Sequence, residues 1–323
     1  MSTAAAALRA NTQLLVAAAK NGRAIACDVD ATKFILAYPR GAYTGARTVE
    51  QTKIFDYEGH IARLVNSTLA MQPKQDELAP SAAAVETVLR PRTEATLRAA
   101  MQSLHQQFDA KPTEEYKITV LVCSAEGDAA STATISAKDD PLKSADIYCH
   151  IGLLPPLRSG RVKLVIAGSP RENASAKDSA WVRERKAIYD AMPPDVEEII
   201  LMEPATHLLL EGSQTNFYAI CGGTIYTAED GILKGTVRSL VLEVCQEYGI
   251  PVVLTPPSLD GIDEWEGCFI SSTSRLVLGA ASIAYEDPVS KEKKIKSFES
   301  NSVLDTIIES VRQSVVRKST AVF

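Results

Sequence analysis

The 323-residue sequence lacks a basic excess, an apolar run of membrane-spanning length, and closely spaced cysteines or histidines. Its 34 Lys and Arg residues against 40 Asp and Glu residues give a net charge of −6, which excludes the basic surface that broad nucleic-acid binding requires. The apolar stretches are all shorter than the roughly 18 residues of a transmembrane helix. With 46% hydrophobic residues, the composition predicts a soluble globular protein that binds neither nucleic acid nor membranes.

The six cysteines and four histidines form no metal-binding or disulfide pattern. No CxxC, HxxxH or HExxH pair occurs, and most of the cysteines lie in apolar surroundings. These features predict buried, reduced thiols and no metal site. The residues concerned are Cys27, Cys123, Cys149, Cys221, Cys245, Cys268, His60, His105, His150 and His207.

Residues 1–27 contain no acidic residue, as is common in organelle transit peptides. This stretch is poor in Ser and Arg, however, and residues 12–17 are equally compatible with an ordinary helix. We therefore expect a cytoplasmic protein, with organelle targeting as the open alternative.

The hydrophobic pattern alternates between helical and strand periods, which predicts a mixed α/β or α+β protein. The Pro155–Gly160 segment is the best linker signal and predicts two domains, residues 1–155 and 156–323. Residues 124–146 are small and polar and predict a long loop. The expected helices are 57–72, 92–107, 178–192, 237–248 and 301–316, and the expected strands include 116–122, 162–167, 198–202, 207–210, 216–220, 223–227, 252–254 and 269–272.

Five short segments carry the chemical signal. They are His60-Ile61-Ala62-Arg63-Leu64, Ala176-Lys177-Asp178-Ser179, Glu211-Gly212-Ser213-Gln214-Thr215-Asn216-Phe217, Leu233-Lys234-Gly235-Thr236-Val237-Arg238 and Phe269-Ile270-Ser271-Ser272-Thr273-Ser274. Their order and spacing resemble the fold-type IV pyridoxal-phosphate enzymes. This family contains branched-chain aminotransferases, D-amino-acid aminotransferases and aminodeoxychorismate lyases. The resemblance implies a smaller N-terminal α/β domain, a larger C-terminal pseudo-barrel domain and pyridoxal 5′-phosphate as cofactor.

Pyridoxal phosphate needs a lysine for a Schiff base and an acid beside its pyridine nitrogen. The resemblance assigns these roles to Lys177 and Glu211. Lys186 is the nearest competing lysine, but it falls within a charged run that is typical of a solvated helix face.

The phosphate of the cofactor needs backbone N–H groups, hydroxyls and a cation. The resemblance assigns the N–H groups to Thr236 and Val237 at a helix start, although Thr236 also fits a plain helix N-cap. It assigns the cation to Arg63. It gives the remaining pocket positions to Asn216, Ser272 and Thr273.

Substrate recognition is where the sequence departs from the named branches of the family. Gly41 to Arg47 resembles the substrate-side strand, with Tyr43 facing the cofactor and Arg47 as a candidate carboxylate contact. Cys123-Ser124-Ala125 replaces the Arg-containing loop of the D-amino-acid enzymes, and the Arg-Pro pair of the branched-chain enzymes is missing. The segment Lys177-Asp178-Ser179-Ala180-Trp181-Val182-Arg183 is closest to an aminotransferase-like subgroup found in eukaryotes.

Three functional hypotheses follow. The first is an aminotransferase, similar to the branched-chain or D-amino-acid enzymes, that moves an amino group from an amino acid to a 2-oxo acid. The second is a lyase of the aminodeoxychorismate lyase type, which releases pyruvate. The third is a non-catalytic member, which the intact Lys177, Glu211 and Arg63 argue against. The resemblance also implies a homodimer.

Overall fold

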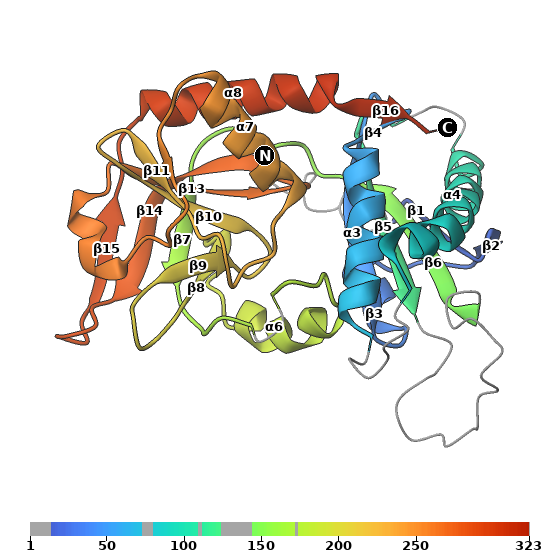
Figure 1. The fold of residues 1–323 in the computed structure, drawn as a ribbon, viewed down its shortest axis with the longest axis horizontal. Helices are drawn as coiled ribbons and strands as arrows, with labels where there is room; N and C mark the ends of the chain where they lie inside the picture. Colours follow the sequence, from blue (N-terminus) through green and yellow to red (C-terminus); the bar gives the residue numbers. More distant parts are fainter. Residues whose placement is uncertain (1–13, 73–79, 109–111, 124–143, 172–173, 323) are drawn as a thin grey trace, which may run out of the picture.

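The computed structural model describes residues 14–72, 80–108, 112–123, 144–171 and 174–322, which form two β-sheets with helices around them (Figure 1). The first sheet has seven strands in the order β16-β4-β3-β5-β6-β1-β2. Its neighbouring strands pair antiparallel throughout. The elements around it are β1 (Val16–Lys20), β2 (Arg23–Ile25), α2 (Ala31–Leu36), β3 (Gly41–Val49), β4 (Lys53–Phe55), α3 (Tyr57–Ala70), α4 (Ala82–His105), β5 (Tyr116–Cys123), β6 (Asp146–Leu153) and β16 (Ser319–Ala321).

The second sheet closes on itself into a barrel. Its strands run β12-β11-β10-β13-β14-β7-β8-β9, and β9 pairs back with β10 through Glu211 and Asn216. The predicted pseudo-barrel is therefore confirmed. Its elements are β7 (Val162–Ile166), α6 (Ala180–Asp190), β8 (Glu198–Met202), β9 (Leu209–Gly212), β10 (Asn216–Cys221), β11 (Thr224–Tyr226), α7 (Thr236–Glu247), β12 (Val252–Val253), the 3-10 helix η1 (Leu259–Glu264), β13 (Gly267–Ser272), β14 (Leu276–Glu286), β15 (Lys293–Ser297) and α8 (Ser302–Arg317).

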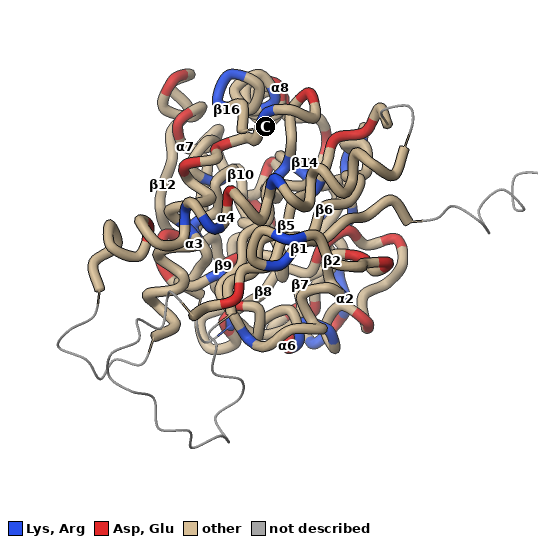
Figure 2. Tube along the Cα trace, turned by 90° about the vertical axis from the view of Figure 1, so that its right-hand side faces the viewer, with Lys and Arg blue, Asp and Glu red and all other residues tan. Residues whose placement is uncertain are grey.

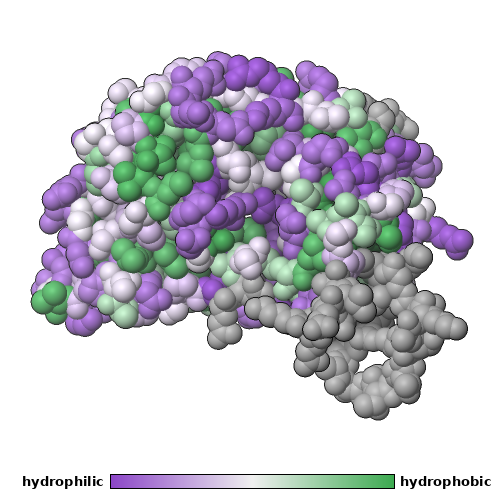
Figure 3. Space-filling model, viewed as in Figure 1, coloured by the Kyte–Doolittle hydropathy of each residue, from purple (hydrophilic) through white to green (hydrophobic). Residues whose placement is uncertain are grey.

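Each sheet has its own apolar core. Helices α3 and α4 cover one face of the first sheet, and their buried residues include Leu64, Leu89 and Leu97. Helices α7 and α8 pack on the barrel through residues such as Val241 and Ile307. Figure 3 shows hydrophilic and hydrophobic residues intermixed over the face seen in Figure 1.

The chain passes from the first sheet to the second between β6 and β7, through the segment that contains Pro155 and Pro156. It also returns, because α8 crosses above both sheets and brings β16 to the edge of the first sheet beside β4 (Figure 1). The last strand, β16, thus pairs with β4, which belongs to the expected N-terminal domain 1–155. The two-domain division remains a proposal, and β16 ties its two parts together.

Several elements differ from the expectation. Helix α4 begins at Ala82 and continues through Pro91, because Val85 and Leu89 are buried and Ser81 caps its first turn. Residues 16–20 form the buried strand β1 and no helix, since β6 pairs with them. The expected loop 124–146 lies mostly outside the described residues. Within the described parts of the chain, no helix is long and apolar enough to cross a membrane.

Candidate active site

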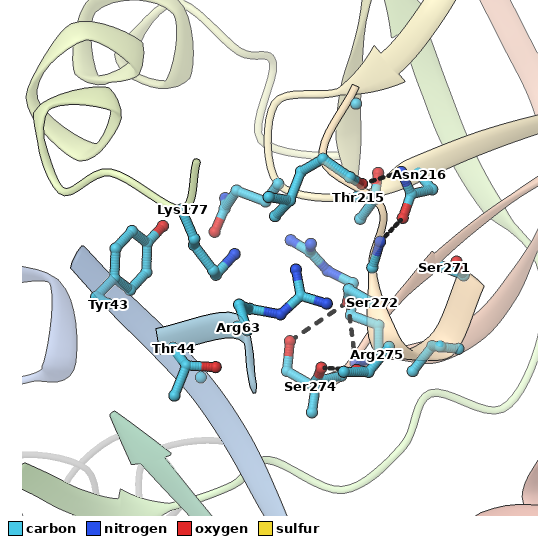
Figure 4. Close-up of a pocket in the computed structure, with 18 of the residues that line it drawn as sticks. Tyr43, Thr44, Arg63, Lys177, Thr215, Asn216, Ser271, Ser272, Ser274 and Arg275 are labelled. Carbon is cyan, nitrogen blue, oxygen red and sulfur yellow. Dashed lines mark hydrogen bonds between the residues drawn. The ribbon is translucent and has the colours of Figure 1, made fainter. Parts of the chain in front are cut away.

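A pocket lies between the two sheets, and both sheets supply its walls. Nine of the ten predicted site residues line it. Figure 4 shows Lys177 and Arg63 pointing into the same space, with Tyr43 beside Lys177. The nine residues are Tyr43, Arg63, Lys177, Glu211, Asn216, Thr236, Val237, Ser272 and Thr273.

Lys177 lies in the segment between β7 and α6, and helix α3 and strand β3 fix its backbone. Its N–H donates to the Ser67 hydroxyl at 3.0 Å, and its carbonyl accepts from the Tyr43 N–H at 2.9 Å. The Lys177 ammonium lies 4.9 Å from the centre of the Tyr43 ring. Burial lowers the pKa of the Lys177 amine well below its usual 10.5, and the charges of Arg63 and Arg171 lower it further. A lysine with a depressed pKa is a neutral nucleophile nearer to neutral pH.

Glu211 ends β9 and is buried, with a side chain that is 6% exposed. Its two oxygens have different partners: Oε1 accepts from Arg171 Nε at 2.8 Å, and Oε2 accepts from the Leu233 N–H at 3.0 Å. Burial raises the pKa of Glu211 above its usual value, while Arg171 acts in the opposite direction. A carboxylate has about four lone-pair sites, so these two bonds leave capacity for a further donor.

Asn216 holds the loop that leads into α7. Its Nδ2 donates to the Leu233 carbonyl at 2.7 Å, and its Oδ1 accepts from the Gly235 N–H at 3.2 Å. A Cβ on Gly235 would lie 2.5 Å from Asn216 Oδ1, so only glycine lets the loop approach this closely. Asn216 therefore sets the position at which α7 begins.

The start of α7 presents free backbone donors to the pocket. Gly235 is the N-cap residue, and among the described residues no side chain caps the first turn. The plain-cap interpretation of Thr236 is therefore wrong. The Thr236 hydroxyl instead lies 3.1 Å from the Thr273 hydroxyl, across the pocket wall. Uncapped N–H groups at a helix N-terminus favour a bound anion.

Arg63 lies on α3 and reaches the same loop from the first sheet. Its Nη2 donates to the Lys234 carbonyl at 2.8 Å, and burial lowers its pKa. Arg63 is partly buried and forms no ion pair with a carboxylate in the part of the chain that the structure describes, and such a cation is costly unless an anion joins it. The uncapped helix start, the two hydroxyls and Arg63 thus fit a phosphate group, and Lys177 and Glu211 fit the aldehyde and ring nitrogen of pyridoxal phosphate.

His60 lies one turn before Arg63 on α3 and also lines the pocket. Its Nδ1 lies 2.8 Å from the Thr44 hydroxyl on β3, and the ring is buried. Burial lowers the pKa of His60 to about 3, which keeps the ring neutral.

Arg47, the tenth predicted residue, does not line the pocket. It lies further along β3, is 7% exposed, and its Nε and Nη1 atoms have no hydrogen-bond partner among the described residues.

Comparisons with known proteins agree with this geometry. The family profile described as amino-transferase class IV matches residues 41–283, three quarters of the chain. The chain belongs to the class IV aminotransferases. This is a family of pyridoxal-phosphate enzymes, as the sequence predicts. Among curated protein sequences, none matches the chain.

Solved structures of aminotransferases share the fold of this family member. A branched-chain aminotransferase from Thermoproteus uzoniensis with norvaline is 18% identical, with a TM-score of 0.67 over 95% of this chain and 99% of that one. An aminotransferase from Brucella abortus bound to the cofactor PLP is 16% identical, with a TM-score of 0.64 over 93% and 99%. A hypothetical aminotransferase from Mycobacterium tuberculosis is 14% identical, with a TM-score of 0.66 over 94% and 99%. At these identities the likeness concerns the fold.

Sequence reasoning missed three charged residues of the pocket and one residue that supports Lys177. Arg171, Lys117 and Arg185 line the pocket, and Ser67 holds the Lys177 backbone. Lys117 is a charged residue within a strand that is rich in β-branched residues, and this contrast could have identified it. Arg185 belongs to a charged run that indicates a solvated face, and no local pattern marked Arg171 or Ser67.

Proposed function

We propose that this protein is a pyridoxal-phosphate-dependent aminotransferase that moves an amino group from an amino acid to a 2-oxo acid, with Lys177 as the catalytic lysine. The observation that carries the proposal is Lys177 itself: a partly buried amine with a depressed pKa, in one pocket with Glu211, Arg63 and an uncapped helix start. Family membership supports the same chemistry.

When bound, the cofactor supplies an aldehyde that links to amines and a protonated ring that draws electrons from the substrate α-carbon. The residues of this chain bind and orient it. Arg63 and the N–H groups of Thr236 and Val237 hold the phosphate, and Ser272 and Thr273 add hydroxyls. Asn216 keeps the loop before α7 in the position that makes those N–H groups available.

Glu211 keeps a proton at the ring nitrogen. Burial raises the pKa of its carboxyl group, and Arg171 and the Leu233 N–H hold the carboxylate in one orientation. Two fixed hydrogen bonds reduce the rotamer entropy that the carboxylate would lose on contact with the ring nitrogen.

Lys177 moves the proton at the reacting centre. A general base works best when its pKa lies near the working pH, and burial together with Arg63 and Arg171 lowers the pKa of this amine. The Tyr43 ring beside the amine limits the directions in which Lys177 can swing. The same amine therefore serves as the attachment point and then as the proton carrier.

Borohydride reduction of the holoprotein, followed by peptide mass analysis, tests the proposal directly. We expect a yellow protein with the cofactor fixed to the peptide that contains Lys177, and no fixation in Lys177→Ala. A panel of amino donors and 2-oxo acids should then show transfer that depends on the acceptor. Pyruvate release without an acceptor, or a protein that does not bind added cofactor, would contradict the proposal.

The assembly is part of the proposal as well. The homodimer follows from the family resemblance, and size-exclusion chromatography with light scattering tests it. A mass near twice 34.8 kDa is the expected result, and a monomer would contradict it.

A further inference from the structure

Glu198 is a buried acidic side chain that the proposed chemistry leaves without a role. Acidic and basic residues are spread over the whole molecule in Figure 2. Glu198 is the first residue of β8 and has the lowest exposure, 0%, of the described acidic residues. A buried carboxylate is costly unless hydrogen bonds or a cation compensate it. The partners of Glu198 therefore indicate which parts of the structure it holds together.

The first oxygen of Glu198 holds the turn between β9 and β10. Its Oε1 accepts from the Ser213 hydroxyl at 2.6 Å and from the Ile199 N–H at 2.9 Å. We call residues 213–215 the ring-side turn, because they begin two positions after Glu211, the proposed partner of the ring nitrogen. The ring-side turn is thus fixed to the start of β8.

The second oxygen of Glu198 reaches a different turn, between β13 and β14. Its Oε2 accepts from Arg275 Nη1 at 3.4 Å, and the Arg275 N–H donates to Ser272 Oγ at 3.3 Å. Arg275 also pairs with Glu197 at 2.8 Å. We call residues 273–275 the phosphate-side turn, because it begins with a hydroxyl that we propose binds the phosphate. One carboxylate is consequently bonded to both turns.

Backbone pairing does not connect the two turns. The ladder between β10 and β13 ends with Asn216 opposite Ser271, before either turn begins. Figure 4 shows Thr215 and Arg275, one from each turn, on the same side of the pocket. Among the described residues, no hydrogen bond joins one turn directly to the other. The link between them therefore runs through Glu198.

Resting on the proposed aminotransferase function, we propose that Glu198 is a positioning residue that sets the ring-side turn relative to the phosphate-side turn. Glu198 itself does not line the pocket. The ring nitrogen and the phosphate of the cofactor are joined by covalent bonds, so their separation is nearly fixed. A shift of either turn would lose the contact to one of these two groups, and Glu198 prevents that shift.

Titration of the apoprotein with deoxypyridoxine phosphate tests the inference without turnover. This probe has the ring and phosphate of the cofactor but no aldehyde, so attachment to Lys177 does not contribute. Glu198→Ala should raise the dissociation constant at least about tenfold, because it leaves Ser213 and Arg275 without their shared acceptor. Glu198→Gln can still accept from Ser213 but loses the ion pair, so it should raise the constant less, by about threefold or more.

Glu286→Ala is the matched control, because Glu286 is an exposed strand glutamate that does not line the pocket. It should leave the affinity for the probe unchanged. The visible circular dichroism of protein saturated with pyridoxal phosphate reports how rigidly the ring is oriented. This signal should fall in Glu198→Ala and stay unchanged in Glu286→Ala.

A comparison of backgrounds distinguishes positioning from a general loss of stability. In the double variant Ser213→Ala, Arg275→Met, both links are already absent. Adding Glu198→Ala to this double variant should therefore raise the dissociation constant of the probe by no more than about twofold. A purely structural role of Glu198 would lower the affinity equally in both backgrounds.

Two results would overturn the inference. One is unchanged probe affinity in Glu198→Ala, or in Glu198→Gln where the alanine variant does not fold. The other is a tenfold loss that persists in the double variant. Amino-group transfer by the wild-type protein would leave the aminotransferase standing in either case. A wild-type protein that binds the probe but transfers no amino group refutes the aminotransferase, while the probe affinities still decide the role of Glu198.

Discussion

Replacement of Gly235 by alanine tests the site where the loop before α7 meets Asn216. The new Cβ would lie 2.5 Å from Asn216 Oδ1, closer than any real contact. Asn216 cannot turn away freely, because its Nδ2 is bonded to the Leu233 carbonyl at 2.7 Å. Overpacking of this kind costs about 1–3 kcal/mol. Gly235→Ala should therefore destabilise the apoprotein by about that amount.

The companion variant Asn216→Ala removes both hydrogen bonds that hold the loop. Each contributes about 0.5–1.5 kcal/mol, so this variant should lose about 1–3 kcal/mol. The two losses should not add in the double variant, because Asn216→Ala removes the atom that the new Cβ would strike. We expect the double variant to be about 1–2 kcal/mol more stable than the sum of the two single changes implies.

Urea unfolding of the apoproteins measures the cycle, and titration with pyridoxal phosphate measures the site. Each single variant should raise the dissociation constant of the cofactor about tenfold or more, since the N–H groups at the start of α7 are moved away from the phosphate. Gly261→Ala is the matched control, because a Cβ at Gly261 has no neighbour within 4 Å. Additive losses within about 0.5 kcal/mol, or unchanged cofactor affinity in both single variants, would refute the reasoning.

Three further predictions concern charged or titratable groups of the site. Absorbance between pH 6 and 11 measures the attachment of pyridoxal phosphate to Lys177. Because burial lowers the pKa of the amine, the midpoint of attachment should lie well below pH 10.5, and a midpoint near 10.5 would contradict this. His60 has a folded pKa of about 3 against 6.5 when unfolded, so its contribution to stability is complete above pH 6.5 and is lost as the pH falls toward 3. Between pH 6.5 and 5 the free energy of unfolding of the wild-type protein should fall by about 2 kcal/mol more than that of His60→Gln. An equal fall in the two proteins, measured by urea unfolding at each pH, would argue against this. Arg171→Met leaves the Glu211 carboxylate buried and without its ion-pair partner, so it should lower the free energy of unfolding by about 3–5 kcal/mol. The double variant Arg171→Met, Glu211→Gln should recover part of this loss. A loss below about 1 kcal/mol in denaturant titration would show that the ion pair is not what holds Glu211.

The strongly periodic elements were predictable from the sequence. The helices near Tyr57 and Ser302 and the strand that begins at Tyr116 agree with their predicted ranges to within a few residues. In each of these elements the apolar residues recur at the spacing that places them on the buried face. Strand β1 and the first ten residues of α4 were not predictable, because their conformation depends on packing against β6 and the first sheet.

The local motifs of the sequence determined the family and pointed to the residues that we propose bind the cofactor. Short segments suffice for this, since a lysine before a helix, an acid at a strand end and a glycine before a helix each carry one part of the chemistry. Only the tertiary structure decided that Arg171 pairs with Glu211, and that Lys117 and Arg185 flank the pocket while Arg47 does not. These residues come from different sheets and helices, and no sequence spacing encodes which side chains meet once the barrel closes against the first sheet.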